Sequence, residues 1–279
     1  MQSKTPFSIP VRRMNFAFPD MQRHWYKGNP WITHFLNAMS AVFPDGERFF
    51  MHSVRLYEKQ ITDPVLRQQI RSFIGQEANH GKEHEGFNKA IVEQNPRIHL
   101  DKLMRFTYHG LETIKKIVPK PLQLSMTVGF EHFTAILAHQ TLKHSEDLAS
   151  VGGVYYEIFM WHAVEETEHK AVAYDVYQAV DGRYWLRVGG MLISTTMFVG
   201  VIPIMALTLL AADRRLSDWK SALGWVKFLL IEPGIYTKII PDYFDYYRRN
   251  FHPWMHDNRA LVADRIKQLT PYEVLTKAA

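Results

Sequence analysis

Apolar residues recur at every third or fourth position through most of the chain, and the alternation of apolar and polar residues typical of strands is scarce. This pattern predicts an all-α protein. Proline and glycine mark the expected boundaries: a helix begins near Pro30, the run 44–46 (Pro-Asp-Gly) interrupts it, and another helix follows over residues 47–60. Asp63 before Pro64 is a helix cap followed by a first-turn proline, and it predicts a longer helix that ends near residue 94.

The second half of this region repeats the pattern. Residues 100–118 read as a connecting helix, and long helices are expected over 122–144 and 154–180. Four long helices joined by a connecting helix in mid-chain are typical of a ferritin-like four-helix bundle, here with additional C-terminal helices. The expected organisation is an N-terminal arm (1–28), a di-metal helical bundle (29–182), and an apolar helix with C-terminal helices packed on the bundle or on a membrane (183–279).

The two halves of the predicted bundle share a chemical pattern, in which a lone glutamate on one helix is followed by Glu-x-x-His on the next long helix. Residues three apart lie on the same helix face, so each Glu-x-x-His presents an oxygen and a nitrogen to one point. Di-iron and di-manganese carboxylate bundles use this ligand set. The expected metal ligands are Glu47, Glu77, His80, Glu131, Glu166 and His169.

Three neighbouring side chains extend or complicate this set. His162 lies four residues before Glu166, on the same helix face, and is included as a seventh metal ligand. His84 is a weaker candidate, seven residues after Glu77. The register on the last helix stays open, because Glu165 could replace Glu166; Glu166 is preferred since it reproduces the spacing of the first pair.

Composition and charge support a buried metal centre. The chain has no cysteine, which excludes thiolate ligands, disulfides and cysteine nucleophiles. Four carboxylates carry about −4, which two divalent cations would neutralise. The expected cofactor is a pair of iron ions, with manganese or a mixed manganese–iron pair as alternatives. The net charge of +5 comes without a nucleic-acid-binding motif, so no nucleic acid partner is expected.

The order of these residues resembles the non-heme di-iron arylamine N-oxygenases, whose pattern includes the extra histidine. The chain as a whole resembles a bacterial family described as predicted metal-dependent hydrolases. Four stretches carry that second resemblance: PDGERFF at 44–50, GQEANHGKEH at 75–84, WHAVEETEHK at 161–170 and FHPW at 251–254.

The two resemblances imply different reactions. The first implies an enzyme that activates O₂ to oxidise a small molecule, with an external electron donor. Apolar residues around the proposed ligands favour a hydrophobic or aromatic substrate, and Glu77 and Glu166 are expected to bridge the metals at the catalytic centre. The second implies a metal-dependent hydrolase. Nitrogen and oxygen ligands with open positions suit iron and O₂ better than zinc, so oxidation is the preferred hypothesis. Iron storage, or a structural bundle without organic turnover, is the remaining alternative.

Residues 188–212 contain no charged residue and are long enough to span a bilayer. Pro203 interrupts this run, and a helix that is apolar all round can instead be buried in a protein core or in a homodimer interface. Both interpretations stay open. The N-terminal 19 residues lack the apolar run of a secretory signal, so a cytoplasmic location is expected, with association to the inner face of the membrane as the alternative.

Overall fold

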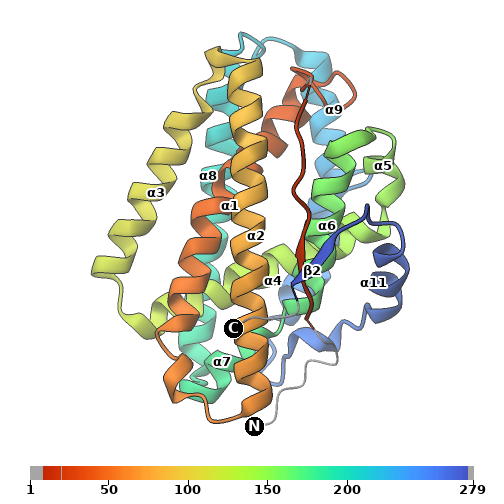
Figure 1. Cartoon of the computed structure of the whole chain (residues 1–279). Helices are drawn as coiled ribbons and strands as arrows, with labels where there is room; N and C mark the ends of the chain where they lie inside the picture. Colours follow the sequence, from red (N-terminus) through yellow and green to blue (C-terminus); the bar gives the residue numbers. More distant parts are fainter. Residues whose placement is uncertain (1–8, 20, 276–279) are drawn as a thin grey trace.

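The computed structural model describes residues 9–19 and 21–275, and the chain is almost entirely helical over this part (Figure 1). This confirms the all-α prediction. The long helices α1 (Pro30–Arg55), α2 (Pro64–Gln94) and α6 (Gly153–His169) run along the length of the molecule, and α4 (Lys120–Lys143) crosses them obliquely. Helix α3 (Leu100–Ile117) connects α2 to α4 along the outside. Helix α1 packs against α2, and α4 packs against α6.

Two helix starts follow from local chemistry. The side chain of Asn29 accepts hydrogen bonds from the backbone N–H groups of Trp31 and Ile32, and Pro30 occupies the first turn of α1. Asp63 caps α2 in the same way, ahead of Pro64. Because capping depends only on neighbouring residues, both starts were predictable from the sequence.

The predicted interruption at residues 44–46 is wrong, since α1 runs through Pro44 without a break. A proline inside a helix leaves the carbonyl four residues earlier without its N–H partner. Here that carbonyl belongs to Ser40, and it accepts a hydrogen bond from Nδ2 of Asn88 on α2 at 2.9 Å. The neighbouring helix thus satisfies the orphaned group, and Glu47 stays on the same continuous helix.

The helix predicted over 154–180 is divided into α6 and α7 (Val172–Val180), with a turn after His169. The turn carries Lys170, whose Nζ is buried and donates to the backbone oxygen of His256 at 2.7 Å and to Asn258 Oδ1 at 2.9 Å. These partners lie more than eighty residues away in the sequence. Local periodicity therefore gave no sign of the break.

The N-terminal arm is more ordered than expected. Its strand β1 (Val11–Arg13) pairs antiparallel with β2 (Glu273–Leu275), with Arg12 opposite Val274. Figure 1 shows the arm running along the bundle beside α2 and α6. The arm thereby brings Arg12 against the helices that carry the candidate ligands.

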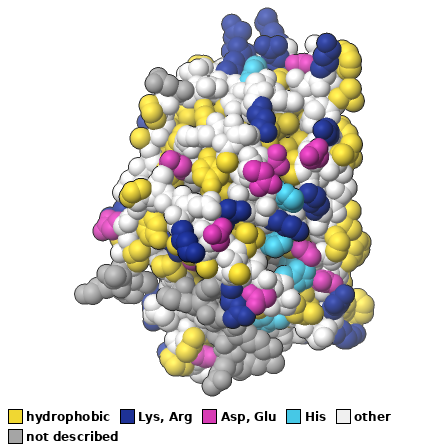
Figure 2. Space-filling model, turned by 90° about the vertical axis from the view of Figure 1, so that its right-hand side faces the viewer, with side chains coloured by type: hydrophobic (Ala, Val, Ile, Leu, Met, Phe, Trp, Pro, Cys, Tyr) yellow, Lys and Arg dark blue, Asp and Glu magenta, His cyan; other side chains and the backbone are white. Residues whose placement is uncertain are grey.

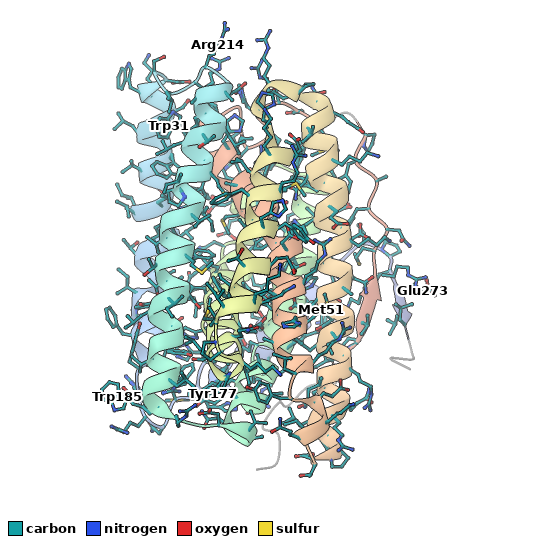
Figure 3. The ribbon with its side chains drawn as sticks, turned by 90° about the vertical axis from the view of Figure 1, so that its left-hand side faces the viewer. Trp31, Met51, Tyr177, Trp185, Arg214 and Glu273 are labelled. Atoms are coloured by element: carbon teal, nitrogen blue, oxygen red, sulfur yellow. The ribbon has the colours of Figure 1, made fainter. Side chains whose placement is uncertain are left out.

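The C-terminal part contains four helices: α8 (Tyr184–Ala212), α9 (Trp219–Leu230), α10 (Ile235–Asp245) and α11 (Arg259–Ile266). Short helices lie between the longer ones: η1 (Glu58–Gln60), η2 (Pro96–Ile98), α5 (Ser145–Ala149) and η3 (Pro253–Met255). Helix α8 packs along α4 and α1 (Figure 3). It is long and apolar enough to cross a membrane, and about a third of its most apolar stretch is buried inside the protein. The packing is closest at Gly190, where a Cβ atom would lie 2.6 Å from the Ser125 backbone.

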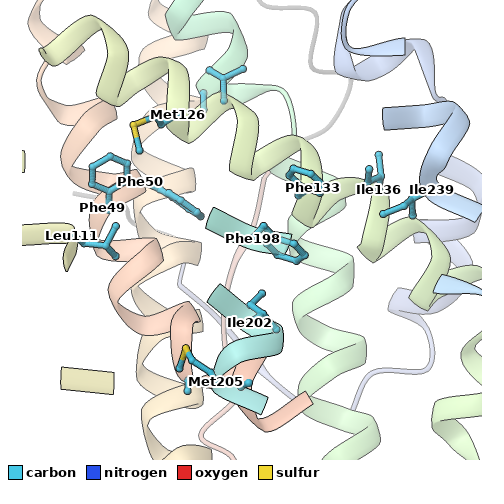
Figure 4. Close-up of a cluster of buried hydrophobic side chains, with 14 of the residues drawn as sticks. Phe49, Phe50, Leu111, Met126, Phe133, Ile136, Phe198, Ile202, Met205 and Ile239 are labelled. Carbon is cyan, nitrogen blue, oxygen red and sulfur yellow. The ribbon is translucent and has the colours of Figure 1, made fainter. Parts of the chain in front are cut away.

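The core between α1, α4 and α8 is aromatic and aliphatic (Figure 4). The rings of Phe133 and Phe198 stack at 5.0 Å, and Phe50 stacks on Phe130 at 5.7 Å. This apolar layer lies directly beside the candidate metal ligands and forms one side of their surroundings.

Candidate metal centre

The structure brings all seven predicted ligands together in the interior of the bundle. Every one of them is at least 96% buried. Their ligand atoms form three overlapping groups, and within each group the atoms lie within 4.8 Å of one another. The groups are Glu47, His80 and His162; Glu77, Glu131 and His169; and Glu77, His80 and Glu166.

Glu166 occupies the middle of this arrangement. Its Oε1 lies 2.9 Å from Nε2 of His162 and 3.6 Å from Nδ1 of His80, while its Oε2 lies 3.6 Å from Nε2 of His169. Glu77 Oε1 lies 3.1 Å from the same His169 nitrogen. The two carboxylates expected to bridge two metals are therefore the two that lie between the histidines.

The donor set fits divalent metal ions. Among the described residues, both carboxylate oxygens of Glu47, Glu77 and Glu131 and both ring nitrogens of His80 are buried without a hydrogen-bond partner. Buried polar atoms without partners are costly, and a metal ion would satisfy many of these at once. The concentration of such atoms at one point makes the site a candidate metal centre.

The electrostatics point the same way. Burial, followed by the neighbouring carboxylates, raises the pKa of Glu47 and Glu131 well above the ordinary value. Burial also raises the pKa of Glu77 to about 7, although His169 opposes the shift. Without a cation these groups therefore retain protons near neutral pH, which metal ions would displace.

The structure places Glu165 and Glu166 in different surroundings. Glu165 faces the N-terminal arm, where its Oε1 lies 3.1 Å from Nη1 of Arg12, and its Oε2 lies 3.2 Å from Nε2 of His80. Arg12 also forms two hydrogen bonds with Glu168, at 2.7 and 2.8 Å. Arg12 thus holds Glu165 at the edge of the centre, while Glu166 lies inside it.

Two supporting residues were missed in the sequence. Gln76 Oε1 lies 2.8 Å from Nδ1 of His169, and Gln76 Nε2 donates to Glu168 at 3.0 Å. With its amide oriented this way, Gln76 Oε1 accepts a hydrogen bond from the Nδ1–H of His169 and leaves the Nε2 lone pair directed at the centre. Gln76 directly precedes Glu77 in the Glu-x-x-His stretch, which was its only local signal. Arg12 had none, because its partners are more than 150 residues away.

His84 contacts the candidate ligand His162 and does not itself face the centre. Its Nε2 lies 2.7 Å from Nδ1 of His162, and its Nδ1 lies 2.8 Å from the hydroxyl oxygen of Ser40. Both ring nitrogens are therefore engaged. The contact fixes the His162 ring so that its other nitrogen faces Glu166 and Glu47.

An apolar cavity of about 210 Å³ adjoins the centre, between α1, α3, α4 and α8. Its charged lining residues are Glu47 and Glu166. The hydroxyl groups in its wall, of Thr107 and Thr134, donate to carbonyls of their own helices. The remaining lining is apolar, and Figure 4 shows several of these side chains: Phe49, Phe50, Leu111, Phe198 and Ile202.

A second polar cluster, near the start of α1, has a different character. Asp213, His24 and His34 lie close enough to hold a cation. However, Arg23 also donates to Asp213, and Asn95 Nδ2 donates to it at 3.0 Å. Both carboxylate oxygens are thus already bonded, so this cluster ties the arm to the end of α8.

These features define a class: a helical protein with a buried carboxylate–histidine metal centre beside an apolar cavity. The family model described as predicted metal-dependent hydrolase matches residues 10–257, so the chain belongs to that family. No curated protein and no solved structure matches the chain. The match confirms the family expected from the sequence, whereas the resemblance to arylamine N-oxygenases is not confirmed. The family description agrees better with the hydrolase alternative than with the preferred oxygenase hypothesis.

Proposed function

We propose that this protein uses two metal ions to hydrolyse a hydrophobic small molecule. One observation carries the proposal: Glu47 and Glu166 belong to the candidate metal centre and also line the apolar cavity. A substrate in the cavity would thus meet the metal ligands directly. The family description supports hydrolysis as the reaction class.

The geometry suggests how the ligands would be shared. Glu47, His80 and His162 would hold one ion, Glu131 and His169 the other, with Glu77 and Glu166 between them. Divalent metal ions would polarise a substrate carbonyl and increase the acidity of water at the site. Two such ions would also balance the four carboxylates, so the buried centre would be close to neutral.

The protein's own side chains would select the substrate. The walls of the cavity offer apolar contacts and no free hydroxyl donor, because Thr107 and Thr134 are bonded to their own helices. Such a cavity binds by excluding water, which favours a substrate with an aliphatic or aromatic body. An ester with a hydrophobic acyl or alkyl group fits these requirements.

The test combines metal analysis with hydrolysis of esters of increasing chain length. The protein loaded with Zn²⁺ or Mn²⁺ should contain about two ions per chain and hydrolyse long-chain esters without O₂. Glu166→Gln should lower metal content and activity, whereas Glu93→Gln, an exposed glutamate on α2, should change neither. Hydrolysis that is equally fast in the metal-free protein would refute the proposal.

A second candidate function is O₂-dependent oxidation of a hydrophobic molecule at the same centre. One observation favours it: the ligands come from four bundle helices as two single glutamates and two Glu-x-x-His pairs, the set used by di-iron carboxylate proteins. This function predicts O₂ consumption by the iron-loaded protein with an external reductant and a hydrophobic substrate. O₂ consumption that yields only ferric iron would indicate iron storage.

A further inference from the structure

Helix α8 presents a long apolar surface that no described part of the chain covers. Over its 29 residues its one charged residue is Arg187, and that side chain is buried. Helix α9, which also packs on α1, carries exposed apolar side chains as well. The exposed members, here called the apolar face, are Trp185, Leu192, Ile193, Val199, Ile204 and Leu207 on α8, and Trp219, Leu223, Val226 and Leu230 on α9.

The polar groups of this surface are arranged for apolar surroundings. The exposed hydroxyls on α8 belong to Thr196 and Thr208, which donate to the carbonyls of Leu192 at 2.9 Å and Ile204 at 2.8 Å. A hydroxyl bonded to its own helix needs no water, and this bonding is typical of helices in lipid. These two hydroxyls therefore present no unsatisfied donor to an apolar phase.

Charge at the edge of the face is positive. Residues 184–230 contain five basic and two acidic side chains. Both acidic groups are engaged: Asp213 with Arg23 and two histidines, and Asp218 as the cap of α9. The exposed charges left at the junction of α8 and α9 are basic, and Figure 3 shows Arg214 at that end. They complement the anionic headgroups of a bilayer.

Exposed tryptophans lie at two positions that suit the headgroup region. Trp185 lies in the first turn of α8 and is 73% exposed, and Trp219 begins α9 and is 63% exposed. Figure 3 shows Trp185 at the end of the molecule opposite Arg214. Tryptophan favours the interface between water and lipid, because its ring is apolar and its N–H is polar.

The cavity beside the metal centre reaches the same side of the molecule. Its outer lining includes Phe106 of α3, which is 65% exposed, and the half-buried Met197 and Val201 of α8. Val199 and Ile204 of the apolar face are their neighbours on α8. A molecule leaving the apolar face between α3 and α8 could thus enter the cavity and reach Glu47.

We propose that the apolar face binds the surface of an anionic lipid bilayer and that the cavity takes its substrate from that bilayer. Helix α8 would lie in the plane of the membrane, since it packs along α4 and α1, and the face of the molecule shown in Figure 2 carries exposed charges of both signs. The binding of the bilayer is inferred from the apolar face and its basic edge, without reference to the reaction. The source of the substrate rests on the proposed function.

The test is flotation of the full-length protein with vesicles of phosphatidylcholine, with and without phosphatidylglycerol. The wild-type protein should float with vesicles, and more of it with phosphatidylglycerol. The double substitution Leu192→Glu with Ile204→Glu removes two exposed apolar side chains and should weaken binding by at least about tenfold. Val65→Glu, at an exposed valine in the first turn of α2, is the matched control and should bind as the wild type does.

Several outcomes would overturn the docking proposal. One is a wild-type protein that does not float with either vesicle, and another is a double variant that floats as well as the wild type. A wild-type dimer that the same two substitutions convert to a monomer, without vesicle binding by either form, would assign the face to a second copy of the chain. Vesicle binding by a protein without hydrolytic turnover would support the docking and refute the proposed function separately.

Discussion

Arg12 gives the sharpest test of how the arm supports the centre. Its guanidinium is 98% buried and lies between Glu165 and Glu168, with contacts of 2.7 to 3.1 Å. Replacing it by methionine keeps much of the side-chain volume but removes the positive charge from two buried carboxylates. Loss of one partner from a buried ion pair costs about 3–5 kcal/mol. For a chain of this size that corresponds to a drop in Tm of roughly 10 °C.

Arg13→Met is the matched control, because Arg13 is the next residue of the same strand and is exposed. Its contact with Glu273 is 3.4 Å between two exposed side chains, and such pairs contribute at most about 1 kcal/mol. Urea unfolding of both variants measures the difference. If the free energies of unfolding of the two variants differ by less than about 1 kcal/mol, the buried ion group does not have the role assigned to it.

The cost of Arg12→Met should depend on pH. Burial raises the pKa of Glu165 to about 7, even though Arg12 opposes the shift. At a pH between the pKa of Glu165 in the unfolded chain and its pKa in the folded protein, the folded protein binds one more proton than the unfolded chain. The free energy of unfolding therefore falls as the pH rises through this range. Without Arg12 the folded pKa rises further and the loss extends to higher pH. The variant should therefore be more destabilised, relative to wild type, at pH 8 than at pH 5.

Three further predictions concern packing, metal and charge. Gly190→Ala should destabilise the protein by about 1–3 kcal/mol, because the new methyl group meets the backbone of α4, whereas Gly189→Ala, which meets open space, should be neutral or stabilising in thermal melts. The Tm of the metal-free protein should fall between pH 5 and pH 8, because carboxyl groups with a raised pKa, such as that of Glu77, give up their protons in this range. The Tm of the metal-loaded protein should not fall in this way. Asp213→Asn should cost about 3 kcal/mol in urea unfolding, against less than about 0.5 for the exposed Asp264→Asn.

The parts of the fold that depend on neighbouring residues could be predicted. The helix starts at Pro30 and Pro64 follow from capping, and the faces of the two Glu-x-x-His pairs follow from helical spacing. The same spacing placed His162 beside Glu166, where the structure has it. The convergence of the seven side chains could be expected because the bundle has a known ligand arrangement.

The parts that depend on distant residues could not be predicted. Helix α1 continues through Pro44, and the carbonyl that this proline leaves without a partner is bonded by Asn88 of another helix. The surroundings of Glu165 depend on Arg12, which reaches it from an arm more than 150 residues away. Periodicity contains no information on such partners, since it describes one element at a time.

The buried glutamates fall into two groups, one that pairs with Arg12 and one that forms the candidate metal centre. Arg12 engages Glu165 and Glu168, which leaves four carboxylates, those of Glu47, Glu77, Glu131 and Glu166, at the centre itself. Four negative charges match two divalent ions, whereas a fifth carboxylate would leave the buried cluster anionic. Two of the four also form the inner end of the apolar cavity. Metal loading would therefore displace the proton that Glu47, with its raised pKa, retains at that end of the cavity in the metal-free protein.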